Sequence, residues 1–212
     1  MKSKAHPDKI ITINNLITAV EAGANIKYLF FWGHQKPDSG VNKSCLSQWY
    51  QASFSIDGVL YHTAEHYMMA EKAKSFNDQR LYKKIITTSH PSEAKRLGRE
   101  IIGFDERVWC ANRFDIVVKG NLAKFSQNPT LQDYLLGTQQ RVLVEASPVD
   151  RIWGIGLAAD HADATNPAKW KGENLLGFAL MLVRQNLLKQ SGTSKNVTKI
   201  SIFLGKILNY RR

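Results

Sequence analysis

The stretch FSIDGVLYHTAEHYMMAEKAKSF, residues 54–76, contains a change of sequence period that decides the fold. Its first part has two β-prone runs on either side of Asp57-Gly58, a pair that supplies the positive φ angles of a tight hairpin turn. Thr63 is then a candidate N-cap for a segment rich in Ala, Met, Glu and Lys, which favour helix. The stretch therefore predicts a short hairpin followed directly by a helix.

The sequence around this stretch predicts few strands and many helices. Four consecutive apolar residues within 27–33, and the run at 141–146, are typical of short buried strands. Residues 10–20 mix apolar and polar residues without a clear period and are assigned to a helix, and helix-favouring and capping residues predict further helices at 78–87, 91–101, 105–126 and 129–136. A long loop at 147–173 precedes a strongly apolar final helix. This order predicts a single compact α+β domain that is predominantly α-helical.

The composition is that of an ordinary globular protein. Hydrophobic residues make up 43% of the 212 positions and charged residues 22%, which is typical of one domain with a substantial core. No apolar run approaches the ~20 residues that span a bilayer, and the N-terminus lacks the apolar segment of a secretory signal. Cys45 and Cys110 suggest no disulfide framework. We therefore expect a cytoplasmic protein with no membrane contact.

The formal net charge of +11 is concentrated at the ends of the chain. Residues 188–212 hold six basic residues and no acidic one, whereas residues 28–187 carry a net charge of only +3. This basic tail either steers the protein toward nucleic acid or an anionic surface, or is a solvated appendage that aids solubility. The body of the protein is not strongly basic.

The helix predicted at 64–74 presents the first candidate for chemistry. Glu65, Met69 and Lys72 are spaced i, i+4, i+7 and so share one helix face. Partial burial there would raise the pKa of the glutamate and lower the pKa of the lysine, the shifts that acid–base or Schiff-base chemistry requires. The alternative is a surface ion pair with Met69 in the core.

Two further segments carry candidate residues. Asp150 lies three residues before Trp153 in a glycine- and tryptophan-rich loop, which suits a polar ligand beside a stacking surface. Trp109 and Arg113 are four apart on one helix face and could hold a base or a phosphate. The alternatives are a turn-forming aspartate with a packed indole, and an aromatic ring beneath an arginine stem.

Signatures of bound cofactors are missing. The sequence has no P-loop, no GxSxG and no HExxH, and the GIG at 154–156 is not a dinucleotide fingerprint. The six histidines show no spacing that, with cysteine, indicates zinc. We therefore expect no metal and no redox cofactor.

Taken together, these segments resemble the NADAR family, whose best-known members are the YbiA-like N-glycosidases. The resemblance runs in order from about residue 28 to residue 187. It is carried by LSQWY (46–50), AEHYMMAEKA (64–73), W-x3-R (109–113), LVEASPVDRIWGIG (143–156) and GENLLGFALMLVR (172–184). The predicted organisation is therefore a YbiA-like domain at 28–187, an N-terminal extension at 1–27 and the basic tail at 188–212.

The resemblance implies hydrolysis of N-glycosidic bonds in a mostly helical domain. It implies two substrate classes, the ribosylaminopyrimidine phosphates of riboflavin synthesis and ADP-ribose on guanine in nucleic acid. The functional positions of the family fall on Glu65, Lys72, Trp109 and Asp150. Members often have Gln where this chain has Met69, and the loop at 34–44 is longer here, so substrate choice could differ.

On this hypothesis Glu65 is the principal acid or base and Asp150 its partner, in roles that could be exchanged. Trp109 stacks on the base or excludes water, and Lys72 anchors a phosphate or forms a Schiff base. Phosphate contacts are expected from Arg113, from Lys74 or from the main chain of 172–177 at a helix N-terminus. The other expected substrate contacts are Trp32, Gly33, Met69, Trp153 and Asn174.

Two other classes of function stay open. The domain could be a non-catalytic reader that binds ADP-ribose or NAD, although a reader needs no set of acid, base and amine. It could instead be a nucleic-acid-binding protein that acts through its basic tail.

Overall fold

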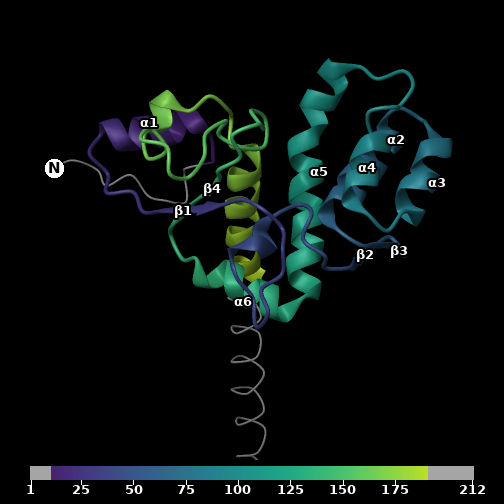
Figure 1. Cartoon of the computed structure of the whole chain (residues 1–212), viewed down its shortest axis with the longest axis horizontal. Helices are drawn as coiled ribbons and strands as arrows, with labels where there is room; N and C mark the ends of the chain where they lie inside the picture. The colour runs from purple at the N-terminus through teal and green to yellow at the C-terminus, as the bar shows by residue number, and fades with distance from the viewer. Residues whose placement is uncertain (1–10, 191–212) are drawn as a thin grey trace, which may run out of the picture.

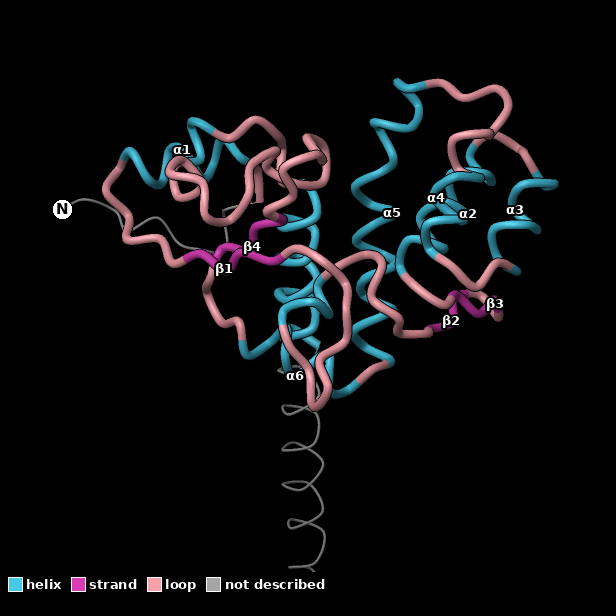
Figure 2. Tube along the Cα trace, in the orientation of Figure 1, coloured by secondary structure: helices cyan, strands magenta, loops and turns pink. Residues whose placement is uncertain are grey.

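The structure, a computed structural model, describes residues 11–190 and confirms the predicted α+β class with mostly helical content (Figures 1 and 2). The first half contains α1 (Ile13–Glu21), β1 (Tyr28–Phe31), the 3-10 turn η2 (Lys43–Leu46), β2 (Phe54–Ile56), β3 (Val59–Tyr61) and α2 (Ala64–Ser75). Then follow α3 (Gln79–Thr87), α4 (Pro91–Leu97), α5 (Glu106–Gln127), α6 (Pro129–Gly137), β4 (Val142–Glu145) and η3 (Pro167–Lys169). A final helix occupies residues 175–190.

The hairpin and α2 form as the local sequence predicts. Asp57 and Gly58 have φ angles of 51° and 78°, and strands β2 and β3 pair in antiparallel fashion on either side of them. The Thr63 hydroxyl accepts a hydrogen bond from the His66 N–H and so caps α2. Most side chains of α2 are buried, because the helix packs against α3, α4 and α5.

A parallel pair of strands joins two distant parts of the sequence. β1 pairs with β4, with Tyr28 opposite Val142 and Phe31 opposite Glu145. All four residues of β4 are buried, and the final helix packs closely on this strand, since a Cβ at Gly177 would collide with the carbonyl oxygen of Leu143. Local sequence patterns predict both strands but not their pairing.

The elements form two groups with α5 between them (Figure 1). One group contains β1, β4, α1 and the final helix, and the other contains α2, α3, α4 and the hairpin. Leu16 and Ala19 of α1 are buried, so the described part of the N-terminal extension belongs to the packed fold. Residues 1–10, and the predicted basic tail from residue 191 onward, lie outside the described residues.

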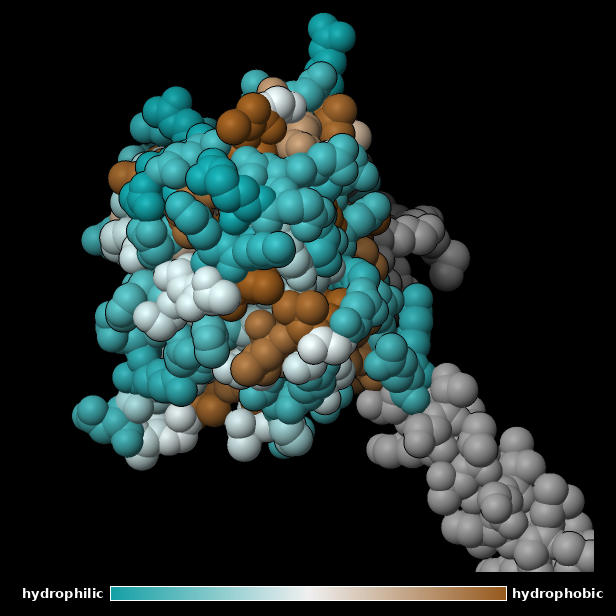
Figure 3. Space-filling model, turned by 90° about the vertical axis from the view of Figure 1, so that its right-hand side faces the viewer, coloured by the Kyte–Doolittle hydropathy of each residue, from teal (hydrophilic) through white to brown (hydrophobic). Residues whose placement is uncertain are grey.

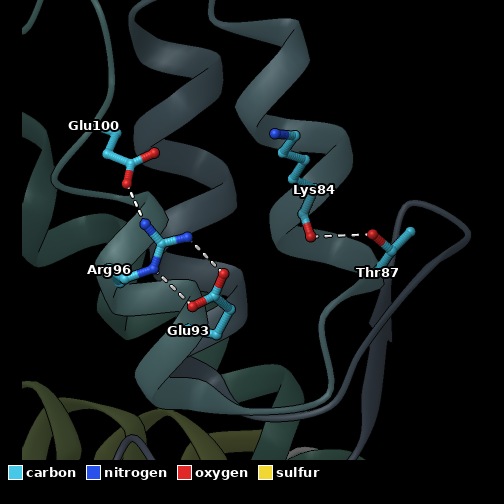
Figure 4. Close-up of polar contacts among 5 residues, drawn as sticks. All are labelled: Lys84, Thr87, Glu93, Arg96 and Glu100. Carbon is cyan, nitrogen blue, oxygen red and sulfur yellow. Dashed lines mark hydrogen bonds and ion pairs between the residues drawn. The ribbon is translucent and has the colours of Figure 1, made fainter.

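Helix α4 is shorter than the predicted helix at 91–101. It ends at Leu97 with Gly98 as its C-cap, and the chain then turns at Gly103, which adopts a φ of 72°. On its outer face Arg96 is bound by the carboxylates of Glu93 and Glu100 (Figure 4).

The connection from α4 to α5 exposes apolar side chains. Ile102, Phe104 and Val108 are 72%, 44% and 42% exposed. Apolar side chains gather at the top of the view in Figure 3, over this connection. Within residues 11–190, no helix is both long enough and apolar enough to cross a membrane.

Candidate active site

A cavity of about 590 Å³ lies between the two groups of elements. Segments from distant parts of the sequence converge on it. Its lining comprises Trp32, Gly33 and His34 after β1; Ser47, Gln48 and Trp49 after η2; Glu65, Met68, Met69 and Lys72 of α2; Lys95, Gly98 and Arg99 at the end of α4; Trp109 of α5; Glu145, Ser147, Val149, Asp150, Ile152 and Trp153 at and after β4; and Leu176 of the final helix. Eight of the eleven residues expected to form the site therefore line one cavity.

Glu65 is the most buried acid in this lining. Its side chain is 3% exposed, and its Oε1 has no hydrogen-bond partner among the described residues. Burial raises the pKa of Glu65 to about 7, opposed by the positive charge of Lys95 and a hydrogen bond from Trp49. A carboxyl with this pKa can both donate and accept a proton near neutral pH.

Asp150 is held as a fixed acceptor at the edge of the cavity. Its Oδ1 accepts hydrogen bonds from the backbone N–H groups of Ile152 and Trp153, at 2.9 and 2.8 Å. Asp150 therefore forms a turn, which was the alternative to a ligand-binding role, and it also lines the cavity. Its negative charge contributes to the raised pKa values of Glu65 and Glu145.

Lys72 is not part of a surface ion pair. Its Nζ donates to the carbonyl oxygen of Gly98 at 2.8 Å and lies 4.2 Å from the ring centroid of Phe104 and 5.7 Å from that of Trp109. Burial, followed by the positive charge of Arg99, lowers the pKa of the Lys72 ammonium. A larger share of neutral amine results, and the neutral amine is the nucleophilic form.

Four indoles contribute to the walls. Trp109 is 9% exposed and lies deep in the cavity, whereas Trp32 is 58% exposed and lies at its edge. Trp49 and Trp153 complete the set. Their flat faces can stack on a heterocyclic base while excluding water from the acids.

Helix α5 fixes the segment that carries Gln48 and Trp49. The fully buried ammonium of Lys124 donates to the carbonyl oxygens of Cys45 and Ser47, at 2.7 and 2.8 Å. The Asn121 amide donates to Gln48 Oε1 at 2.7 Å, and burial lowers the pKa of Lys124 to about 8. Lys124 is thus distant in sequence from the segment that carries Gln48 and Trp49, but it holds this wall of the cavity in place.

Arg113 and Asn174, two of the expected substrate contacts, are not in the cavity lining. Arg113 pairs with Glu173 at 3.3 Å. Asn174 is fully buried: its Nδ2 donates to the carbonyl of Leu143 and its Oδ1 accepts from the N–H of Glu145. Because the strand backbone uses both ends of the amide, Asn174 positions β4 instead of meeting a ligand.

The other expected phosphate contacts are also engaged elsewhere. Lys74 pairs with Glu71 at 2.8 Å. The N–H groups of residues 173–176, at the start of the final helix, donate to carbonyl oxygens of residues 151–154. They are therefore not free to receive an anion.

Glu145 is a site residue that the sequence reasoning missed. It ends β4, is 8% exposed, lines the cavity and has an Oε2 without a hydrogen-bond partner among the described residues. Burial, with the negative charge of Asp150, raises its pKa to about 8. The available signal was a glutamate at the carboxyl end of the apolar run 141–146, an edge where α/β proteins bind ligands.

Comparisons with known proteins identify the family of this chain. The family model of the NADAR domain matches residues 30–188. An N-glycosidase of Acanthamoeba polyphaga mimivirus is 45% identical over 164 residues, which cover 75% of this chain and 95% of that protein. A riboflavin biosynthesis protein of Vibrio vulnificus is 32% identical over 152 residues, covering 72% of this chain but only 37% of that protein.

A solved structure extends the comparison to the fold. The NMR structure of the Escherichia coli protein YbiA superposes with a TM-score of 0.63 at 27% identity, over 78% of this chain and 87% of that one. In sequence, the N-glycosidase YbiA of E. coli is 33% identical over 132 residues, which are 62% of this chain and 74% of that protein. The chain therefore belongs to the NADAR family, and it is an N-glycosidase, a hydrolase of N-glycosyl compounds.

Proposed function

We propose that this N-glycosidase hydrolyses the bond between ribose and base in a ribosyl phosphate or an ADP-ribosyl substrate, with Glu65 at the centre of the reaction. The observation that carries the proposal is that Glu65 has an unpartnered carboxyl oxygen in the cavity that Asp150 also lines. The substrate classes are ribosylaminopyrimidine phosphates, which the name of the Vibrio relative favours, and ADP-ribose on guanine.

The reaction needs one group that gives a proton and one that takes it. As the bond from the anomeric carbon to nitrogen breaks, its electron pair leaves with the base, whose nitrogen takes up a proton. A water oxygen bonds to the anomeric carbon and gives up a proton. Positive charge develops on the sugar between these events, and a fixed carboxylate stabilises it.

The cavity offers a carboxyl group for each task. Glu65, with its pKa of about 7, accepts the proton from water. Asp150, fixed by two backbone N–H groups, supplies the negative charge that stabilises the sugar cation. Glu145, with its pKa of about 8, holds the proton for the departing base. Trp109 stacks on that base and keeps water away from it.

Lys72 has two roles that experiment separates. As an ammonium it anchors the substrate, and as a neutral amine it attacks the opened sugar and forms a Schiff base with loss of water. Borohydride reduces a Schiff base to a stable adduct that mass spectrometry detects on the peptide containing Lys72. A fully active enzyme that yields no adduct excludes the covalent role.

The activity is tested by incubating the full chain with both substrate classes and detecting the freed base by mass spectrometry. Glu65→Gln should lower kcat by about 10²- to 10⁴-fold, because the glutamine cannot take up the proton. Glu71→Gln is the matched control, because Glu71 lies on the same helix, pairs with Lys74 and is absent from the cavity lining. Unchanged turnover by Glu65→Gln would contradict the assignment.

A further inference from the structure

The end of α4 brings three basic residues close together, and they fall into two groups. Arg96 lies on the outer face, where Glu93 and Glu100 neutralise it (Figure 4). Lys95 and Arg99, four residues apart, line the cavity instead. Among the described residues, neither Lys95 nor Arg99 has a carboxylate within ion-pair distance.

The positive charge on this wall is concentrated. Arg99 is close enough to Lys72 that its charge lowers the pKa of that ammonium. Both Lys95 and Arg99 also act on the pKa of Glu65. Like charges held together in a concave site raise the local positive potential, which an anion relieves.

The surroundings favour an anion that is joined to an aromatic group. Lys95 Nζ lies 5.7 Å from the ring centroid of Trp49, another residue of the cavity lining. The cations thus border both an indole face and the acid Glu65. A ribosyl phosphate has the same sequence of parts, with its phosphate and its base joined to opposite ends of one ribose.

Two of the basic groups that sequence reasoning assigned to phosphate are paired with acids. Arg113 binds Glu173, and Lys74 binds Glu71. Lys95 and Arg99 have no such acidic partner among the described residues, so both remain able to bind phosphate by charge-assisted hydrogen bonds.

We propose that Lys95 and Arg99 form the phosphate-binding subsite of this enzyme and hold the phosphate on the 5′-carbon of the substrate ribose. The proposal deepens the proposed function and rests on it for the identity of the substrate. A monoester in a ribosylaminopyrimidine phosphate and the diphosphate of ADP-ribose present the same chemistry to the subsite.

The test measures binding alone, so it does not depend on turnover. Ribose 5-phosphate, ADP-ribose and unphosphorylated ribose are titrated calorimetrically into the full chain and into Lys95→Gln, Arg99→Gln and Arg96→Gln. Arg96→Gln is the matched control, because it removes one positive charge from the same segment but from the paired, outer side. Thermal unfolding checks that each variant is folded.

Lys95→Gln and Arg99→Gln should each bind ribose 5-phosphate and ADP-ribose about tenfold or more weakly than the natural chain. The affinity of Arg96→Gln should stay within about twofold of that of the natural chain. A loss confined to ADP-ribose would assign the subsite to the diphosphate, and an equal loss for both ligands would assign it to the first phosphate.

Equal affinity for both phosphorylated ligands in all four proteins, or an equal loss in Arg96→Gln, would overturn the proposal. So would a natural chain that binds neither phosphorylated ligand at millimolar concentration. A chain that binds both ligands but releases no base would instead refute the proposed function and leave the subsite standing.

Discussion

Replacing Glu145 with glutamine changes the pH dependence of stability in a direction that the structure fixes. The substitution keeps the shape of the side chain and removes its titration. In the folded chain, burial and the charge of Asp150 raise the pKa of this carboxyl from 4.5 to about 8. At ~1.36 kcal/mol for each pKa unit, the difference corresponds to on the order of 5 kcal/mol.

The sign follows from which state keeps the proton. Below pH 4.5 the carboxyl is protonated in both states, so the two proteins differ little in titration energy. Between pH 4.5 and about 8 the unfolded chain ionises while the folded chain does not, and the natural protein loses stability relative to the variant. Above pH 8 the loss is complete.

The assay is urea unfolding of the natural chain and of Glu145→Gln from pH 5 to pH 9. We expect the variant to gain a few kcal/mol relative to the natural chain across this range. Glu106→Gln is the control. Because Glu106 is an exposed carboxylate in the first turn of α5, this substitution should change the free energy of unfolding by less than about 1 kcal/mol. A stability difference between Glu145→Gln and the natural chain that does not vary with pH would refute the reasoning.

The same variant tests the catalytic role of Glu145. If its proton goes to the departing base, kcat should fall by about 10²- to 10⁴-fold. In the natural enzyme activity should decline as pH rises through about 8, because the acid form is then lost. The variant should lack this decline, and an unaltered pH profile of base release would exclude the role.

Two further substitutions test how the walls of the cavity are held. Lys124→Met should cost about 1–3 kcal/mol, because the Cys45 carbonyl oxygen loses its donor while the Ser47 carbonyl oxygen keeps the N–H of Tyr50. Urea unfolding measures the loss, with the exposed Lys119→Met as control, and a neutral result would show that water replaces the amine. Gly177→Ala should lower stability by about 1–3 kcal/mol, because its Cβ would meet the backbone of β4. Gly137→Ala, which places its Cβ in open space, should not, and equal melting temperatures for these two alanine variants would refute the packing argument.

The parts of the fold that sequence predicts are those decided by neighbours along the chain. The predictions of a turn at Asp57-Gly58 and of an N-cap at Thr63 are both confirmed, because each feature depends only on residues close to it in sequence. The parallel pairing of β1 with β4 is different, since its partners lie more than 100 residues apart and their apolar patterns fit several arrangements. The position of the cavity depends on that pairing.

The same division explains the expected and missed site residues. Spacing correctly placed Glu65, Met69 and Lys72 on one face, and all three line the cavity. It could not show that both ends of the Asn174 amide are used by β4, a strand some 30 residues away in sequence. Glu145 was missed for a related reason, because a glutamate at the end of an apolar run shows its burial only when neighbouring elements cover it.

On the proposed mechanism, the two glutamates place stability and activity in conflict in this fold. Glu65 on α2 and Glu145 on β4 each keep a carboxyl oxygen buried without a partner, an arrangement that costs free energy. The packing of α2 among three helices and the hydrogen bonds of Asn174 hold these groups in place despite that cost. A ligand that supplies hydrogen-bond partners to both oxygens would recover part of it, so substrate binding should stabilise the folded chain.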